Sequence, residues 1–185
     1  MGRFVIISGP SCIGKGPLCA ALKKFYPELA GDLKQVILYN DRAPRPAEVD
    51  GVDYHFRSRE EIESHRDRDE FMVMEVRGDL QALDLKELEA LLKSGDAFFE
   101  GNSWVGRELL TCPIPDGMER LSMFLAPLSK EEILYLKDPS RGVDLEKFVT
   151  DVMRRKLLRR TQRQKTILSL KDLEEIERRC GKAYA

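Results

Sequence analysis

A strand and a loop meet in the stretch Phe4-Val-Ile-Ile-Ser-Gly9-Pro-Ser-Cys-Ile-Gly14-Lys15-Gly16-Pro17, which decides the fold of this chain. The β-branched run Phe4 to Ile7 is typical of a strand buried on both faces. The spacing Gly9-x-x-x-x-Gly14-Lys15 is that of a phosphate-binding loop, where backbone N–H groups, a helix N-terminus and a lysine surround phosphates. We therefore predict a nucleoside triphosphate site made of Gly9, Pro10, Ser11, Cys12, Ile13, Gly14, Lys15 and Gly16.

One position of the loop departs from that pattern. The residue after the lysine is normally Ser or Thr, whose hydroxyl ligates Mg²⁺. This chain has Gly16 there, followed by Pro17, which suits the first turn of a helix but has no side-chain oxygen. We expect phosphate binding to survive this change better than metal ligation. Cys12 is either a readily ionised thiol beside Lys15 or a small residue that fills the loop.

Composition narrows the class of protein. The chain has 185 residues, 42% of them hydrophobic and 34% charged, which suffices for one compact unit with subdomains. Its net charge of -1 gives no reason to expect a nucleic-acid partner. We expect a cytoplasmic protein without membrane spans or a leader, because no apolar run is long enough and Met1 leads directly into the first strand. The four cysteines are too dispersed to predict zinc or disulfides.

A second informative stretch is Arg42-Ala-Pro-Arg45-Pro-Ala-Glu48-Val-Asp-Gly51-Val-Asp-Tyr54-His-Phe56. Its two arginines lie three residues apart, and each is followed closely by a proline that restricts the backbone. A tyrosine hydroxyl follows after a glycine turn. Two guanidinium groups and a phenol suit a phosphate monoester, although a solvated surface pair is the alternative interpretation of the arginines.

Together, the two stretches resemble guanylate kinase, whose members carry Arg-x-Pro-Arg-x-Gly-Glu-x-x-Gly-x-x-Tyr-x-Phe in their GMP-binding region. The resemblance implies an α/β, three-layer P-loop kinase fold with a central parallel sheet. The core would comprise about residues 1–37, 94–127 and 161–185, with an inserted GMP-binding subdomain at about 38–93 and a lid at about 128–160. It also implies transfer of the γ-phosphate of ATP to GMP, giving ADP and GDP, with Mg²⁺ as the expected cofactor.

Residue roles follow from the same resemblance. The predicted catalytic residues are Lys15, Arg42, Arg141 and Arg155, and those predicted to bind the GMP phosphate are Arg42, Arg45 and Tyr54. The second lid arginine of the family falls at Val152, so Arg155 or Arg154 would have to replace it.

Several base-contacting positions depart from the family. Leu38 replaces a serine, Val73 replaces a glutamate, and the second phosphate-binding tyrosine is absent from residues 80–82. The replacements predicted to bind GMP are Glu75, Glu100 and Asn102. Glu100 is also the candidate oxygen ligand for Mg²⁺, through water, or else a structural partner of a lysine. Because lost hydrogen-bond partners reduce discrimination, we expect weak GMP selectivity or a different acceptor.

Two alternatives stay open at this point. One is a kinase for another small phosphate ester, and the other is a catalytically weak, scaffold-type module that binds a phosphorylated ligand.

The hydrophobic pattern also predicts the remaining elements. We expect strands at Leu33–Tyr39, Ala97–Phe99 and Leu121–Leu125, the last two buried, and helices at about Gly14–Phe25, Leu80–Lys93, after the capping box Ser129–Glu132, from Asp144, and at Leu168–Arg179.

Overall fold

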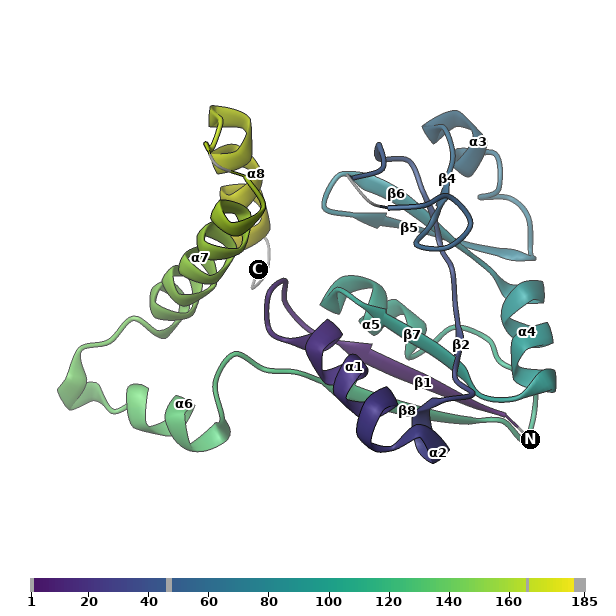
Figure 1. Ribbon diagram of the computed structural model, residues 1–185, viewed down its shortest axis with the longest axis horizontal. Helices are drawn as coiled ribbons and strands as arrows, with labels where there is room; N and C mark the ends of the chain where they lie inside the picture. Colours follow the sequence, from purple (N-terminus) through teal and green to yellow (C-terminus); the bar gives the residue numbers. More distant parts are fainter. Residues whose placement is uncertain (1, 46–47, 166, 182–185) are drawn as a thin grey trace. The chain divides into compact units, whose positions relative to one another are not determined.

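The structure is a computed structural model that describes residues 2–45, 48–165 and 167–181. The chain divides into two compact units, Met1–Ser8 with Gly16–Met123, and Gly9–Lys15 with Phe124–Ala185. In chain order (Figure 1), the elements are β1 (Arg3–Ser8), α1 (Lys15–Phe25), α2 (Pro27–Ala30), β2 (Lys34–Gln35), β3 (Tyr39–Asn40), β4 (His55–Phe56), α3 (Arg59–Glu63), β5 (Phe71–Val76), β6 (Asp79–Asp84), α4 (Leu85–Ser94), β7 (Ala97–Gly101), α5 (Ser103–Leu109), β8 (Glu119–Phe124), α6 (Lys130–Leu136), the 3-10 helix η1 (Pro139–Arg141), α7 (Leu145–Gln164) and α8 (Leu170–Gly181).

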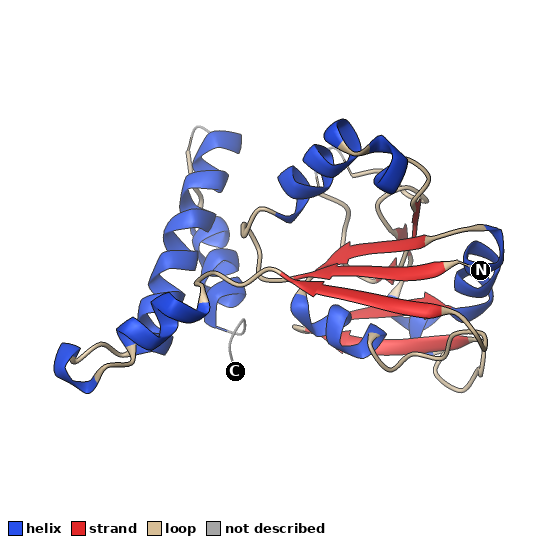
Figure 2. Cartoon of the chain, turned by 90° about the horizontal axis from the view of Figure 1, so that it is seen from below, coloured by secondary structure: helices blue, strands red, loops and turns tan. Residues whose placement is uncertain are grey.

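The main sheet of the first unit has the strand order β2-β7-β1-β8, and its strands appear as red arrows in Figure 2. β1 pairs with β7 in parallel, from Phe4 opposite Ala97 to Ser8 opposite Gly101, and β2 is parallel to β7. Side chains alternate along β1, so Phe4 and Ile6 enter a core built with α4 and α5. Val5 and Ile7 face α1 on the other side. Helices therefore cover both faces, which confirms the predicted three-layer α/β class.

A smaller sheet has the order β4-β3-β6-β5 and sits in the same unit. β5 and β6 form a hairpin closed by Arg77 and Gly78, both with positive φ (58° and 91°). Such angles at both central residues match the right-handed twist of a two-residue hairpin, and Gly78 adopts its angle without strain. One face of this sheet contributes Met74 and Val76 to the main core. The other face packs against Ile62 of α3.

The second unit contains the loop Gly9–Lys15 and the C-terminal helices. α6 begins with a complete capping box between Ser129 and Glu132, as predicted. α7 begins after the N-cap Asp144 and packs against α8. Their shared apolar core consists of Val149, Met153, Leu157, Ile176 and Cys180.

Two predicted elements are wrong in part. Leu33–Tyr39 is not one strand, because β2 and β3 belong to different sheets and the chain between them crosses from one to the other. The predicted helix Leu80–Lys93 begins only at Leu85, after the N-cap Asp84. Its first residues form β6, in which both faces are buried. Burial on both faces hides the strand period of two, so the leucines suggested helical spacing.

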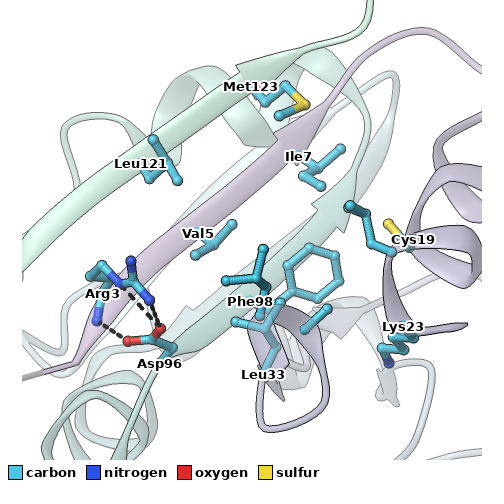
Figure 3. Close-up of a pocket in the computed structure, with 13 residues that line it drawn as sticks. Arg3, Val5, Ile7, Cys19, Lys23, Leu33, Asp96, Phe98, Leu121 and Met123 are labelled. Atoms are coloured by element: carbon cyan, nitrogen blue, oxygen red, sulfur yellow. Dashed lines mark hydrogen bonds and ion pairs between the residues drawn. The ribbon is translucent and has the colours of Figure 1, made fainter. Parts of the chain in front are cut away.

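The strand predicted at Leu121–Leu125 exists as β8, but its predicted burial is wrong. β8 lies at the edge of the main sheet, and Leu121 and Met123 are 55% and 48% exposed. Figure 3 shows both side chains beside Val5, Ile7 and Phe98, around a cavity of about 310 Å³. An edge strand has a neighbour on one side only, which leaves its apolar residues partly exposed.

Across the part of the chain that the structure describes, every helix is too short or too polar to cross a membrane. The predicted division into core, insert and lid is a different partition from the two compact units, and it stays a prediction.

Candidate functional site

A bidentate ion pair between Arg42 and Glu48 forms the centre of the candidate acceptor site. Arg42 Nη1 and Nη2 donate to Glu48 Oε2 and Oε1 at 2.7 and 2.8 Å. Glu48 Oε2 also accepts from the backbone N–H of Arg45 at 2.7 Å. The buried Asn40, at the end of β3, accepts from the backbone N–H of Arg42 at 3.1 Å. These bonds hold the Arg42 guanidinium in one orientation, and we call Arg42, Arg45, Glu48 and Tyr54 the arginine cradle.

Two aromatic rings pack against the Arg42 guanidinium. Its Cζ lies 5.1 Å from the centre of the Tyr54 ring and 5.4 Å from that of Phe56. Cation–π attraction at these distances adds to the ion pair and limits the positions open to the side chain. The Arg42 side chain is only 13% exposed, whereas that of Arg45 is 49% exposed. Arg42 is therefore preorganised, and Arg45 is the more accessible cation.

The protonation states of the cradle suit the binding of an anion. Burial alone would raise the pKa of Glu48, but the hydrogen bonds from Arg42 and Arg45 outweigh burial and hold that pKa below its usual value. Burial raises the pKa of the Tyr54 phenol. At neutral pH, Glu48 is thus ionised and Tyr54 keeps its proton. Guanidinium groups and a neutral phenol are donors suited to a phosphate monoester.

A row of side chains extends from the cradle across the smaller sheet. Paired residues on adjacent strands share a face, and Phe56, Asn40, Gln81 and Met74 are successive partners across β4, β3, β6 and β5. Gln81 is 4% exposed, and within the described residues its Oε1 has no hydrogen-bond partner. Buried polar atoms are normally paired, so this oxygen needs an explanation. The sequence did not single out Gln81, because it fell inside the predicted helix.

The three candidate base contacts lie in different surroundings. Glu75 is exposed on the opposite face of β5 from Met74, the face that carries Val73 and packs against α3. Asn102 uses its Oδ1 to accept from the backbone N–H of Val105 at 3.0 Å, as the N-cap of α5. Glu100 lies at the carboxyl end of β7 and is partly exposed.

Leu38, which stands where the family has a base-reading serine, is 2% exposed in the main core. The structure does not bring Glu75 to the face that carries the cradle, and the base contacts at Glu75, Glu100 and Asn102 stay predictions.

The predicted phosphate loop runs from Gly9 to Gly16 between β1 and α1. Lys15 Nζ donates to the carbonyl oxygens of Gly9 and Pro10 at 2.9 and 3.0 Å, so the lysine folds back across the loop. A Cβ at Gly9 would lie 2.6 Å from the carbonyl oxygen of Leu125, and φ at Gly14 is 109°. Both positions therefore require glycine. Apart from its chain neighbours and the adjoining backbone of α1, no described atom lies within 4 Å of a Cβ built at Gly16.

Two arginines of the C-terminal helices contact this loop. Arg179 Nη2 of α8 donates to Ser11 Oγ at 3.0 Å, and Arg160 Nη1 of α7 contacts Cys12 Sγ at 3.8 Å. Cys12 also packs against the apolar core between α7 and α8. Neither arginine was among the predicted site residues, because the contacts span more than 140 positions and no local pattern marks them.

The predicted lid arginines differ in their surroundings. Arg141 is the last residue of the 3-10 helix η1, and its Cζ lies 3.4 Å from the centre of the Tyr135 ring. Arg154 donates to Glu177 Oε1 and Oε2 at 2.6 and 2.9 Å and so joins α7 to α8. Arg155 is exposed. Of the two arginines that could replace the one missing at position 152, Arg155 is thus the accessible one, while Arg154 is held in a structural ion pair.

The described residues do not fit a protein-built Mg²⁺ site. Gly16 supplies no hydroxyl at the position where phosphate loops ligate the metal. Within residues 2–45, 48–165 and 167–181, no group of three or more His, Cys, Asp and Glu side chains is arranged to hold a metal ion. Glu100 alone is one carboxylate, whereas Mg²⁺ takes six oxygen ligands, several of them waters. A metal ligand at Glu100 stays a prediction.

Known proteins resemble the chain over most of its length. The family model described as Guanylate kinase matches residues 1–99. Guanylate kinase of Idiomarina loihiensis is 34% identical over 154 residues, which are 83% of this chain and 70% of that protein. Guanylate kinase of Pseudomonas fluorescens strain Pf0-1 is 32% identical over 154 residues, 83% of this chain and 71% of that protein. A crystal structure of guanylate kinase from Anaplasma phagocytophilum aligns with a TM-score of 0.47 and 21% identity, covering 76% of this chain and 66% of that one. Residues 1–99 include both the phosphate loop and the arginine cradle.

Proposed function

The chain belongs to the guanylate kinase family, and from this premise we propose that it transfers the γ-phosphate of ATP to GMP, giving ADP and GDP. The observation that carries the proposal is the arginine cradle, in which Arg42 is oriented by Glu48 and stacked on Tyr54. The cradle also holds a second arginine, whose Nη1 lies 3.6 Å from Glu48 Oε1. Arg45, 49% exposed, is that second cation.

The acceptor step assigns a role to each cradle residue. Arg42 and Arg45 bind the phosphate of GMP, and the Tyr54 hydroxyl donates a further hydrogen bond. Glu48 keeps Arg42 in place, since its own charge repels phosphate and its position is set by three hydrogen bonds. The Gln81 carboxamide, whose Oε1 has no partner among the described residues, lies on the face that Asn40 and Phe56 share and would hydrogen-bond the acceptor as well. Phosphoryl transfer needs little more than such positioning and charge neutralisation.

The donor step depends on the phosphate loop. Its backbone N–H groups and the start of α1 would surround the ATP phosphates, and Lys15 would leave the carbonyls of Gly9 and Pro10 to contact them. Arg141 and Arg155 are proposed to neutralise charge on the transferring group. Guanylate kinases use ATP with a divalent metal ion, generally Mg²⁺. In this chain we propose that the metal enters with the ATP phosphates, because Gly16 offers it no oxygen.

A phosphoryl-transfer assay tests the proposal. Purified full chain is incubated with MgATP and, in parallel, with GMP, AMP, CMP, UMP and ribose 5-phosphate, and ADP formation is measured. We expect ADP formation with GMP, and its loss in Arg42→Gln. The matched control is Arg66→Gln, which removes a surface arginine paired with Glu63 in the same unit. The assignment is overturned if the other acceptors are phosphorylated and GMP is not.

Selectivity is a separate readout of the same assay. Leu38 lies in the core and offers no hydrogen bond, so fewer polar groups read the base than the family pattern provides. We expect discrimination between GMP and AMP to be weaker than in a site whose buried polar groups all pair with guanine. A GMP preference above about 10⁴-fold would show that other residues read the base.

A further inference from the structure

We propose that the hairpin of α7 and α8 clamps the phosphate loop through Arg160 and Arg179, which act as positioning residues for the donor nucleotide. The inference rests on the proposed function in one respect only, that the loop binds ATP. It assigns the basic end of α7 and the end of α8 a role that local sequence patterns do not reveal. The contacts that carry it all lie within the second unit.

The first contact joins α8 to the loop. Arg179 Nη2 donates to Ser11 Oγ at 3.0 Å, a normal hydrogen-bond length. Arg179 and Ser11 are both partly buried, so solvent competes only in part for this bond. Ser11 lies in the centre of the loop, between the two glycines that shape it. A bond at this position limits the movement of the segment whose N–H groups would face phosphate.

The second contact joins α7 to the next residue of the loop. Arg160 Nη1 lies 3.8 Å from Cys12 Sγ, and the Cys12 side chain packs against the α7–α8 core. Cys12 has φ = 62°, a left-handed conformation that is unfavourable for a residue with a Cβ. Such a conformation persists when the surroundings determine it more strongly than the local preference. The packing and the Arg160 contact are those surroundings.

The hairpin itself is firm enough to act as a clamp. Met153 and Leu157 of α7 and Ile176 of α8 are at most 3% exposed. Beside this core, Arg154 and Glu177 form a bidentate ion pair across the two helices. Arg160 and Arg179 extend from this packed pair, so their positions at the loop follow from the packing of the helices.

Charge adds a reason for arginine at both positions. Bound triphosphate brings several negative charges to the loop, and Gly16 removes the hydroxyl that would otherwise ligate an accompanying metal ion. Guanidinium groups never lose their charge near neutral pH. Two of them against the loop therefore raise its affinity for phosphate while they hold its shape.

Donor binding provides the first test. We compare Arg160→Gln and Arg179→Gln with Arg159→Gln, which removes the same charge from an exposed neighbour on α7. The dissociation constant for ATP is measured by calorimetry, together with KM for ATP and for GMP. We expect Arg160→Gln and Arg179→Gln each to raise the dissociation constant for ATP about tenfold, as loss of one hydrogen bond to a charged group does. KM for GMP should not change in these variants, and ATP binding should not change in Arg159→Gln. Equal effects in Arg159→Gln would overturn the proposal.

Partner dependence sharpens the result. If Arg179 positions the loop through Ser11, then Ser11→Ala also weakens ATP binding, and the loss in the double variant with Arg179→Gln is smaller than the sum of the two single losses. Arg179→Lys should recover part of the affinity, because lysine keeps the charge and one donor. Additive effects of Ser11→Ala and Arg179→Gln would refute the clamp.

A third readout needs no nucleotide. The alkylation rate of Cys12 by iodoacetamide, followed by peptide mass spectrometry, reports how firmly the loop is packed. We expect faster labelling in Arg160→Gln and Arg179→Gln than in wild type and Arg159→Gln, with Cys19 as internal reference. Failure of the wild-type chain to bind ATP would refute the proposed function, while unchanged Cys12 labelling would refute the clamp.

Discussion

Replacement of Glu48 by glutamine is a direct perturbation of the arginine cradle. Glu48 accepts hydrogen bonds from Arg42 at 2.7 and 2.8 Å and from the backbone N–H of Arg45 at 2.7 Å. Glutamine has nearly the same shape but no charge, and it offers one acceptor oxygen in place of two. In Glu48→Gln, the Arg42 guanidinium, 13% exposed, therefore lacks its counter-charge.

The expected loss of stability follows from these contacts. A hydrogen bond with a charged group contributes about 1.5–3 kcal/mol. One of the two bonds from Arg42 is lost outright, and the remaining bonds to position 48 lose the carboxylate charge. Solvent still reaches both side chains, which reduces the penalty below that of a fully buried ion pair. We expect the free energy of unfolding at neutral pH to fall by about 2–3 kcal/mol.

The pH dependence separates the charge of Glu48 from its shape. Burial by itself would raise the pKa of Glu48, yet the hydrogen bonds from Arg42 and Arg45 hold that pKa below its usual value. A carboxylate with a lowered folded-state pKa stabilises the fold above its unfolded pKa, about 4.3, and this contribution is lost as pH falls through the folded pKa. The difference between wild type and Glu48→Gln should therefore be constant near neutral pH and shrink below about pH 4.

Urea unfolding across this pH range measures the difference, with Trp104 fluorescence and circular dichroism as probes. Glu63→Gln is the matched control, because Glu63 pairs with Arg66 on the surface and both side chains are about half exposed (50% and 48%). Such pairs contribute little, so the control should unfold close to wild type. The reasoning is refuted if Glu48→Gln loses no more stability than Glu63→Gln, or if its deficit is the same in acid as at neutral pH.

Further predictions concern single residues of the two sites. In steady-state assays, kcat/KM for MgATP should be about tenfold higher in Gly16→Thr than in Gly16→Ala. The space at Gly16 is open, and threonine adds a metal-ligating hydroxyl that alanine lacks. Equal values of kcat/KM in the two variants would contradict this. Gln81→Leu should leave the free energy of unfolding unchanged or raise it, since a buried unpaired oxygen is removed, while KM for GMP rises; unfolding and kinetics measured together would show both signs. Tyr54→Phe should raise KM for GMP about tenfold at constant KM for ATP, because one hydrogen bond to the acceptor phosphate is lost; titration of GMP at saturating ATP tests this.

Local pattern in the sequence was sufficient for the strand, loop and helix that open the chain. Glycine spacing and Lys15 are short-range features, and the structure has Lys15 folded against Gly9 and Pro10 within the same loop. The arginine motif is also a local feature, since Arg42 contacts both Glu48 and Tyr54 within thirteen positions, while its role in phosphate binding stays a prediction. The N-caps at Ser129 and Asp144 could be predicted as well, because a cap bonds to residues only a few positions away.

Tertiary structure alone decided what depends on distant neighbours. β6 reads as helix because both of its faces are covered, and only its pairing with β5 and β3 identifies it as a strand. The same pairing places Gln81 beside Asn40, and it places Glu75 on the opposite face of the sheet. No local spacing in the sequence conveys either placement. Arg179 reaches Ser11 across 168 positions. Periodicity and propensity act over a few residues, whereas these contacts arise only when packing brings separate segments together.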